Sequence, residues 1–165
     1  MKINFLNYDG VAKATRDEML RVMENALNML GEPTNMEINV GFVTPEEIKE
    51  VNNKERGKNS STDVLSFPSF ELKPFEKVDL TLDKYKWNIN PENGYFVLGD
   101  MLLCKEIAKT QAKELHHTLK EELIRLSLHS LLHCLGFDHI EDKDYEVMHK
   151  AELEILSACG YNNLD

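Results

Sequence analysis

The sequence predicts a mixed α+β fold in a single domain, with a small mixed sheet packed against helices. Three observations support this fold class: the chain has 165 residues, 42% of them are hydrophobic, and strand-like segments mostly precede helical ones. This length suits one domain and is short for two. The hydrophobic fraction is sufficient for a real core. We therefore expect residues 1–165 to fold as one unit, with strands mostly first and helices mostly last.

The first part of the chain contains three predicted strands and two predicted helices. Short alternating or apolar runs predict strands at 2–8, 36–43 and 62–67. The first helix spans 13–30, where apolar residues share one face, and it ends at Gly31. A second, short helix begins at Thr44 because threonine caps a helix, Pro45 fits the first turn and Glu47 completes a capping box.

The second part of the chain is predicted to be mainly helical. A polar loop covers 52–61, before the third strand, and the segment 69–94 has too weak a pattern for more than a long loop or hairpin. Residues 95–103 again resemble a strand. Helical periodicity then predicts three helices, which begin near Lys105, at Thr118 and near Asp144.

Charge and cysteine content exclude several classes of protein. The chain has 19 Lys and Arg against 29 Asp and Glu, a net charge of −10 that argues against coating nucleic acid by bulk attraction but leaves a local basic groove open. No apolar run approaches the ~18 residues of a membrane span, and residues 1–10 do not resemble a secretory signal. The three cysteines are too few and too far apart for a disulfide framework. We expect a cytoplasmic protein without membrane or disulfide partners.

All the histidines lie in the last third of the chain, at His116, His117, His129, His133, His139 and His149. Because His129 and His133 are four residues apart on a predicted helix, their imidazoles project from one face and can reach one metal ion at about 2.0–2.1 Å. Gly136 can adopt a left-handed conformation and turn the chain back, which places His139 to complete a triangle. Three histidines leave a tetrahedral ion one open position, as in catalytic sites. The alternative is that these are ordinary histidines on an apolar helix.

The spacing of these histidines and Gly136 coincides with the metzincin peptidase motif, but one functional group is missing. The glutamate that acts as general base in that motif is replaced by Ser130. A serine cannot perform the proton transfer of a carboxylate near neutral pH. A peptidase would therefore need a base from elsewhere in the chain.

Other residues near the histidines have two interpretations. Asp138 and Asp142 are either acceptors for imidazole N–H groups or turn-forming aspartates. Cys134 points about 100° away from its histidine neighbours and is expected to be a small core residue. His116 and His117 are expected in loop or capping roles rather than as ligands.

The histidine string resembles the H-G-x-x-H-L-x-G-Y-D-H signature of the YbeY family of bacterial endoribonucleases. Residues 52–58, followed by 62–68, are similar to the family's N-x-x-x-R-x-K and T-D-V-L-S-F-P segments, and Leu98-Gly99-Asp100 is similar to its L-G-D-I strand. The resemblance covers nearly the whole chain. Two departures are Ser130 in place of the usual glycine and a longer segment at 69–94.

The resemblance implies a zincin-like fold, with the metal site on a helix in the C-terminal half and one zinc ion on His129, His133 and His139. It also implies a catalytic arginine at Arg56 and cleavage of single-stranded RNA. The cellular roles would be ribosomal RNA processing, at the 3′ end of the small-subunit RNA, and ribosome quality control, with ribosomal RNA and the ribosome as partners.

The chemistry of phosphodiester cleavage explains why an arginine would matter. Charge develops on the non-bridging oxygens, and a guanidinium can hold two of them at once. Taken alone, Arg56 is better explained as a solvated charge of the basic segment that includes Lys54 and Lys58, and the resemblance reverses this preference. Two other functions stay open: a metzincin-like zinc metallopeptidase, which Ser130 argues against, and a non-catalytic ribosome-assembly protein with structural zinc, which the open coordination position argues against.

Overall fold

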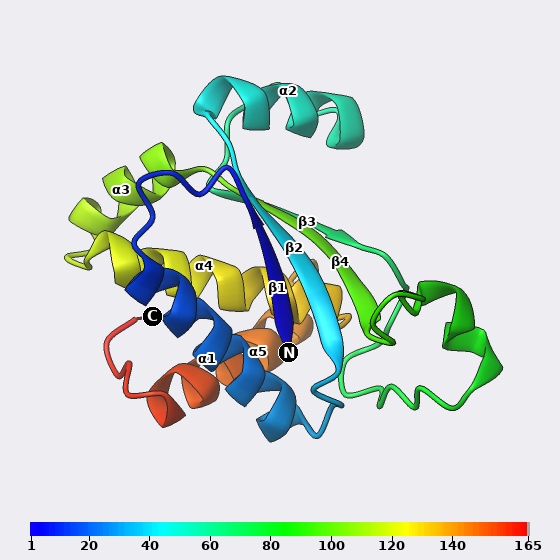
Figure 1. The fold of residues 1–165 in the computed structure, drawn as a ribbon. Coiled ribbons are helices and arrows are strands. Elements are labelled where there is room, and N and C mark those ends of the chain that lie inside the picture. Colours follow the sequence, from blue (N-terminus) through cyan, green and yellow to red (C-terminus); the bar gives the residue numbers. More distant parts are fainter. Residues whose placement is uncertain (165) are drawn as a thin grey trace.

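The computed structural model describes residues 1–164 and contains one mixed four-stranded sheet (Figure 1). Its strands, in the spatial order β1-β2-β4-β3, are β1 (Lys2–Leu6), β2 (Met36–Phe42), β4 (Phe96–Leu103) and β3 (Val64–Pro68). The β1–β2 and β2–β4 pairs are parallel, whereas β3 is antiparallel to β4 and forms one edge of the sheet. This architecture confirms the predicted α+β class with a small mixed sheet.

Most of the helices form a layer against one face of the sheet (Figure 1). The helices are α1 (Lys13–Leu30), α2 (Pro45–Arg56), α3 (Lys105–Glu114), α4 (Leu119–Cys134) and α5 (Asp142–Ala158). Helix α4 contacts α1, α3, α5, β3 and β4, so it is the central element of this layer. Helix α2 lies apart, where Ile48 packs with Leu65 and Cys104 in a second, smaller core.

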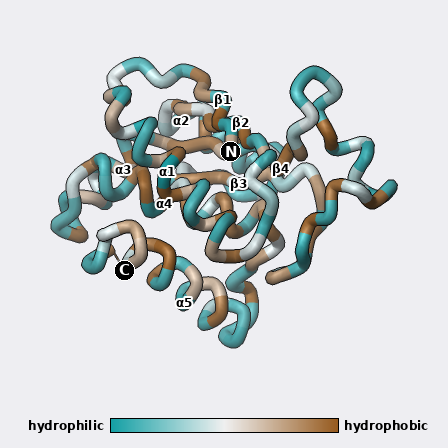
Figure 2. Tube along the Cα trace, turned by 60° about the horizontal axis from the view of Figure 1, so that its bottom comes forward, coloured by the Kyte–Doolittle hydropathy of each residue, from teal (hydrophilic) through white to brown (hydrophobic). Residues whose placement is uncertain are grey.

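The two cores lie on opposite faces of the sheet, because successive side chains of a strand point to opposite faces. On β4, Met101 and Leu103 belong to the main core with α1 and α4, whereas Leu102 packs in the smaller core beneath α2. Hydrophobic positions accordingly gather along the strands and α4 (Figure 2). The helix α4 that carries two of the predicted metal ligands is thus held on several sides by packed side chains.

Local capping signals set several helix ends as predicted. Thr44 and Thr118 each form both hydrogen bonds of a capping box, with Glu47 and Glu121. The predicted polar loop at 52–61 is wrong in its first part, because α2 continues to Arg56 and ends at Gly57, whose φ is +67°. Arg56 therefore projects from the last turn of a helix rather than from a loop.

The segment 69–94, which we call the arm, extends from the β3 edge of the sheet (Figure 1). It is a long loop with one short 3₁₀ helix, η1 (Asp83–Asn88). Tyr85 anchors η1 because its ring is fully buried, with centroids 5.0 Å from Phe70 and 5.5 Å from Phe96. The pattern was weak because this anchoring depends on a few isolated contacts rather than on a periodic apolar face.

Two further observations concern the cysteines and the apolar character of the helices. All three cysteines are buried and free. Within residues 1–164, no helix combines the length and the apolar character needed to cross a membrane.

Candidate metal centre

The three predicted ligands meet at the C-terminal end of α4. His129 and His133 lie one turn apart, with ring centroids 4.6 Å from each other, and His139 lies 5.5 Å and 4.9 Å from them. One nitrogen from each ring lies within 4.8 Å of the others. The three side chains therefore form a cluster that can hold a metal ion.

The turn that returns His139 to the helix depends on Gly136. Its φ is +92°, a conformation that residues with a side chain rarely adopt. A Cβ atom at this position would also lie 2.2 Å from the carbonyl oxygen of Leu72, at the start of the arm. Glycine is therefore required here both for the turn and for the close approach of the arm to the metal-ligand loop.

Oxygen acceptors orient two of the imidazoles. Nδ1 of His129 lies 2.7 Å from Oε1 of Glu152 on α5, and Nδ1 of His133 lies 3.0 Å from the carbonyl oxygen of Phe137. When each Nδ1–H donates to its oxygen, both Nε2 atoms keep a lone pair and face the centre of the cluster.

The donor set fits a bound cation. The two Nε2 atoms are 3.1 Å apart, so two lone pairs would repel each other there unless a positive charge lay between them. Two ligands of one tetrahedral zinc ion are separated by about 3.3 Å when each Zn–N bond is about 2.0–2.1 Å. The observed spacing is close to that value without any movement of α4.

The pKa of His133 favours metal binding. Burial is the largest cause and acts together with the neighbouring His129 and His139 to lower this pKa from 6.5 to about 4. His133 is therefore neutral at pH 7, which is the form that binds a metal.

Glu152 was missed by the sequence analysis, which considered Asp138 and Asp142 for this role. Asp138 instead accepts the backbone N–H of His139 at 2.7 Å, and Asp142 is an exposed residue in the first turn of α5. The sequence placed Glu152 on a predicted helix but did not indicate its contact with the metal cluster. Its partner His129 lies 23 residues away, beyond the reach of any local spacing rule.

The remaining neighbours have structural environments. Cys134 is buried in the main core, and burial raises the pKa of its thiol to about 12. His116 and His117 lie between α3 and α4, away from the cluster, where Nδ1 of His117 is 3.4 Å from Glu122.

Arg56 and the three histidines line one open pocket of about 940 Å³. Arg56 reaches it from the end of α2, and its guanidinium donates a hydrogen bond of 3.2 Å to the carbonyl oxygen of Ser66 on β3. Lys58 lines the same pocket. The fold thus brings a guanidinium and a metal-binding cluster, more than 70 residues apart in sequence, to a single solvent-accessible space.

Ser130 does not present a base to this pocket. Its side chain is fully buried, and its hydroxyl lies 2.7 Å from the hydroxyl of Ser66. This position therefore joins α4 to β3, and the carboxylate of the metzincin motif has no replacement at that place in the chain.

We expect replacement of Glu152 by alanine to weaken zinc binding by about 10- to 100-fold, because His129 would lose the acceptor that holds its ring and its tautomer. Affinity would be measured by competition with a fluorescent chelator. Glu154→Ala is the matched control, since Glu154 is exposed on the same helix and pairs only with Lys150 among the described residues. Equal affinities of the two variants would contradict an orienting role for Glu152.

Comparison with known proteins agrees with these features. The family model described as "Endoribonuclease YbeY" matches residues 3–160. The endoribonuclease YbeY of Clostridium beijerinckii is 41% identical over 144 residues, which is 86% of this chain and 85% of the relative. That of Caldicellulosiruptor saccharolyticus is 37% identical over 153 residues, covering 92% and 89%.

The fold also has a solved counterpart. The solution structure of TM1509 from Thermotoga maritima matches with a TM-score of 0.57 and 25% identity, over 98% of this chain and 93% of that one. These matches confirm the resemblance found in the sequence and the predicted zincin-like fold. The chain belongs to the YbeY family of endoribonucleases.

Proposed function

We propose that this YbeY-family enzyme cleaves single-stranded RNA with one zinc ion on His129, His133 and His139, assisted by Arg56. The observation that carries the proposal is that Arg56 and the three imidazoles open onto the same pocket. The cellular reaction would be ribosomal RNA processing, at the 3′ end of the small-subunit RNA, and ribosome quality control. The enzyme would act in the cytoplasm, with the ribosome as partner and one domain over residues 1–165.

Zinc is the metal that this donor set favours. Three neutral nitrogen ligands suit a tetrahedral ion with one position left open. When bound, the ion would polarise a phosphate oxygen or lower the pKa of a bound water toward ~7. The pocket is open to solvent, so a phosphodiester has access to that position.

The chain itself would position the phosphate and stabilise its charge. The Ser66 carbonyl accepts one N–H of Arg56, which directs the side chain toward the pocket and leaves its other N–H groups available. Two of these groups can hold two non-bridging phosphate oxygens. This contact strengthens as negative charge develops during cleavage.

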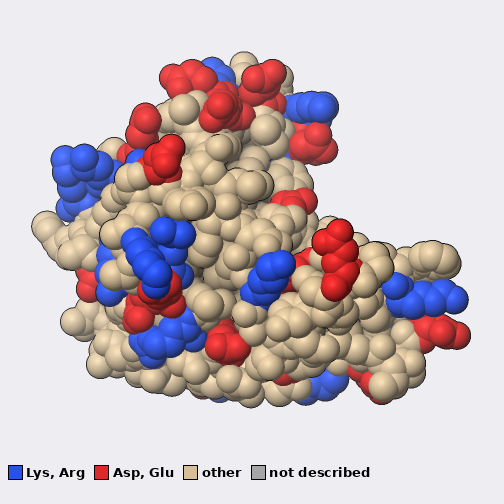
Figure 3. Space-filling view, in the orientation of Figure 1, with Lys and Arg blue, Asp and Glu red and all other residues tan. Residues whose placement is uncertain are grey.

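The acidic net charge is compatible with RNA binding because the charges are distributed unevenly. Acidic side chains gather over α2 at the top of Figure 3, where Glu46, Glu47 and Glu50 lie on the helix. The pocket at the other end of α2 has Arg56 and Lys58 in its lining, together with Asp63, Glu71 and Asp138. Attraction of the phosphate would therefore depend on these two cations and on the bound metal rather than on a positive field over the whole pocket.

Neither alternative function is favoured. A metallopeptidase lacks its base, because Ser130 is buried and bonded to Ser66. A purely structural zinc site is usually closed by a fourth protein ligand, whereas three ligands face an open pocket here.

The test is to incubate the zinc-loaded protein with labelled single-stranded RNA, with the matching RNA duplex and with a denatured protein. We expect cleavage of the single strand, little cleavage of the duplex and no proteolysis, because phosphate cleavage can use Arg56 and the metal whereas proteolysis also needs a carboxylate base. Precursor small-subunit RNA would then be compared with unrelated RNA of equal length. Metal-dependent proteolysis that disappears in His129→Ala would instead support the peptidase.

A further inference from the structure

We propose that the arm is a second part of the RNA-binding surface, in which the indole of Trp87 stacks on a base of single-stranded RNA outside the metal pocket. This inference rests on the proposed function, since it concerns the same RNA substrate. It assigns a role to a segment for which the sequence indicated no function.

Trp87 is unusual in its exposure. The side chain is 87% exposed, whereas Tyr85, two residues earlier on η1, is fully buried. Tryptophan contributes to stability mainly through the large apolar area that it buries, so this ring adds little to the fold. An aromatic ring with this exposure has a face on which another flat ring can stack.

The arm presents this ring on a fixed support. Tyr85 anchors η1 to Phe70 and Phe96, and the side chain of Asn88 donates a 2.8 Å hydrogen bond to the carbonyl oxygen of Ser69. Trp87 therefore lies between two anchored residues. A platform that is already in place loses little conformational entropy when a base binds.

The platform is connected to the metal pocket. Ser69, Phe70 and Leu72 at the start of the arm line that pocket, and Ser69 is the residue to which Asn88 is bonded. The backbone of Leu72 also contacts Gly136 in the metal-ligand loop. The start of the arm thus lies at the pocket and is bonded to the end of η1, so an RNA strand that leaves the pocket along the arm would reach Trp87.

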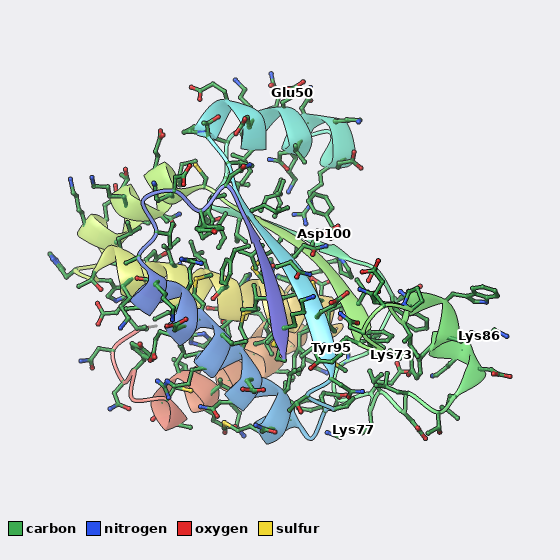
Figure 4. All side chains as sticks on the ribbon, in the orientation of Figure 1. Glu50, Lys73, Lys77, Lys86, Tyr95 and Asp100 are labelled. Atoms are coloured by element: carbon green, nitrogen blue, oxygen red, sulfur yellow. The ribbon has the colours of Figure 1, made fainter. Side chains whose placement is uncertain are left out.

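The local charges fit one nucleotide better than a protein surface. Nζ of Lys86 lies 5.4 Å from the centre of the Trp87 ring, and Lys86 projects from the outer end of the arm (Figure 4). A base on the indole would place its phosphate within reach of this ammonium group. Side chains of both charges lie on the arm in the face shown (Figure 3), and Lys86 is the cation that lies against the indole.

Base stacking also suits an acidic protein. A chain with net charge −10 gains little from bulk attraction to RNA, whereas stacking on an aromatic ring does not require a positive field. Stacking tolerates any base, because every base has a flat face. The arm would therefore increase affinity for single strands without selecting a sequence.

The chain offers a direct probe, because Trp87 is its only tryptophan. Zinc-loaded full-length protein would be mixed with a single-stranded RNA of about 12 nucleotides in a stopped-flow instrument, and tryptophan fluorescence followed before cleavage. We expect quenching with the single strand and none with a blunt duplex. Anisotropy of a labelled RNA would report binding independently.

Variants separate the platform from the pocket. We expect Trp87→Ala to weaken binding of the long RNA by about 5- to 140-fold, the range for one base stacked on an aromatic ring, and Trp87→Phe to recover part of the loss. Binding of a dinucleotide, which fills only the pocket, and the cleavage rate at saturating RNA should not change. Leu82→Ala, at another exposed residue of the arm, is the matched control.

The outcomes distinguish this proposal from the proposed function. RNA binding by anisotropy with unchanged tryptophan fluorescence, or equal affinity of Trp87→Ala and the unaltered protein, would overturn the platform and leave the nuclease intact. Absence of any RNA binding or cleavage would overturn both.

Discussion

Replacing His133 by alanine should remove most of the bound zinc and reduce RNA cleavage by about 1000-fold or more. His133 is the middle ligand of the cluster: it lies nearest to both other imidazoles, and its Nε2 is 3.1 Å from that of His129. Two imidazoles cannot form a tight zinc site. The ion would supply several kcal/mol of charge stabilisation, and each 1.36 kcal/mol corresponds to tenfold in rate.

Metal content and heat stability would test this prediction together. Zinc per chain would be measured after dialysis, and the melting temperature would be measured with and without added zinc. The unaltered protein should gain stability with zinc, because a ligand that binds only the folded state stabilises it, whereas His133→Ala should gain little. His149→Ala is the control, because His149 stacks on Tyr145 of α5 and is not part of the cluster. Zinc retained at one ion per chain in His133→Ala would refute the assignment.

The histidine cluster was predictable because the features that form it are close together in the sequence. The Thr118 capping box sets the start of α4, the four-residue spacing puts His129 and His133 on one face, and Gly136 ends the helix. Each of these features depends on residues within a few positions of one another. The turn to His139 follows from the same short segment.

The supporting contacts were not predictable because they join distant segments. Glu152 reaches His129 only after α5 packs beside α4, and the hydroxyls of Ser66 and Ser130 meet across the junction of β3 and α4. The spacing and composition of a single sequence do not indicate which distant residues will contact each other. The 3₁₀ helix of the arm was missed for the same reason, since Tyr85 is buried against Phe70 at the start of the arm and Phe96 on β4.

The wrongly predicted loop at the end of α2 affects the interpretation of Arg56. The polar composition of 52–61 favoured a loop, but Lys54 and Arg56 lie in the last helical turn, where positive charge complements the helix dipole. Arg56 is therefore placed by a helix end and by its bond to Ser66, rather than by a free loop. This support bears directly on what its substitution should do.

Replacing Arg56 by alanine should lower the single-turnover cleavage rate at saturating RNA by about 100- to 1000-fold, the loss typical of removing one preorganised donor to a developing negative charge. Because the contact strengthens as cleavage proceeds, its removal affects the saturated rate and not only binding. Arg56→Lys should recover little, since an ammonium keeps the charge but loses the planar two-point contact. Zinc content should be unchanged, because Arg56 is not a ligand.

A matched variant and the salt dependence distinguish catalysis from simple attraction. Lys54→Ala removes the same charge from the same helical turn, but Lys54 does not line the pocket, so its saturated rate should stay normal. If Arg56 only attracts the RNA backbone, Arg56→Ala should lower the affinity for RNA and make that affinity less dependent on salt. The cleavage rate at saturating RNA should then be unchanged, and Arg56→Lys should bind RNA almost as well as the unaltered protein. A full saturated rate in Arg56→Ala would therefore leave Arg56 as a binding residue and make the metal centre alone responsible for the chemistry.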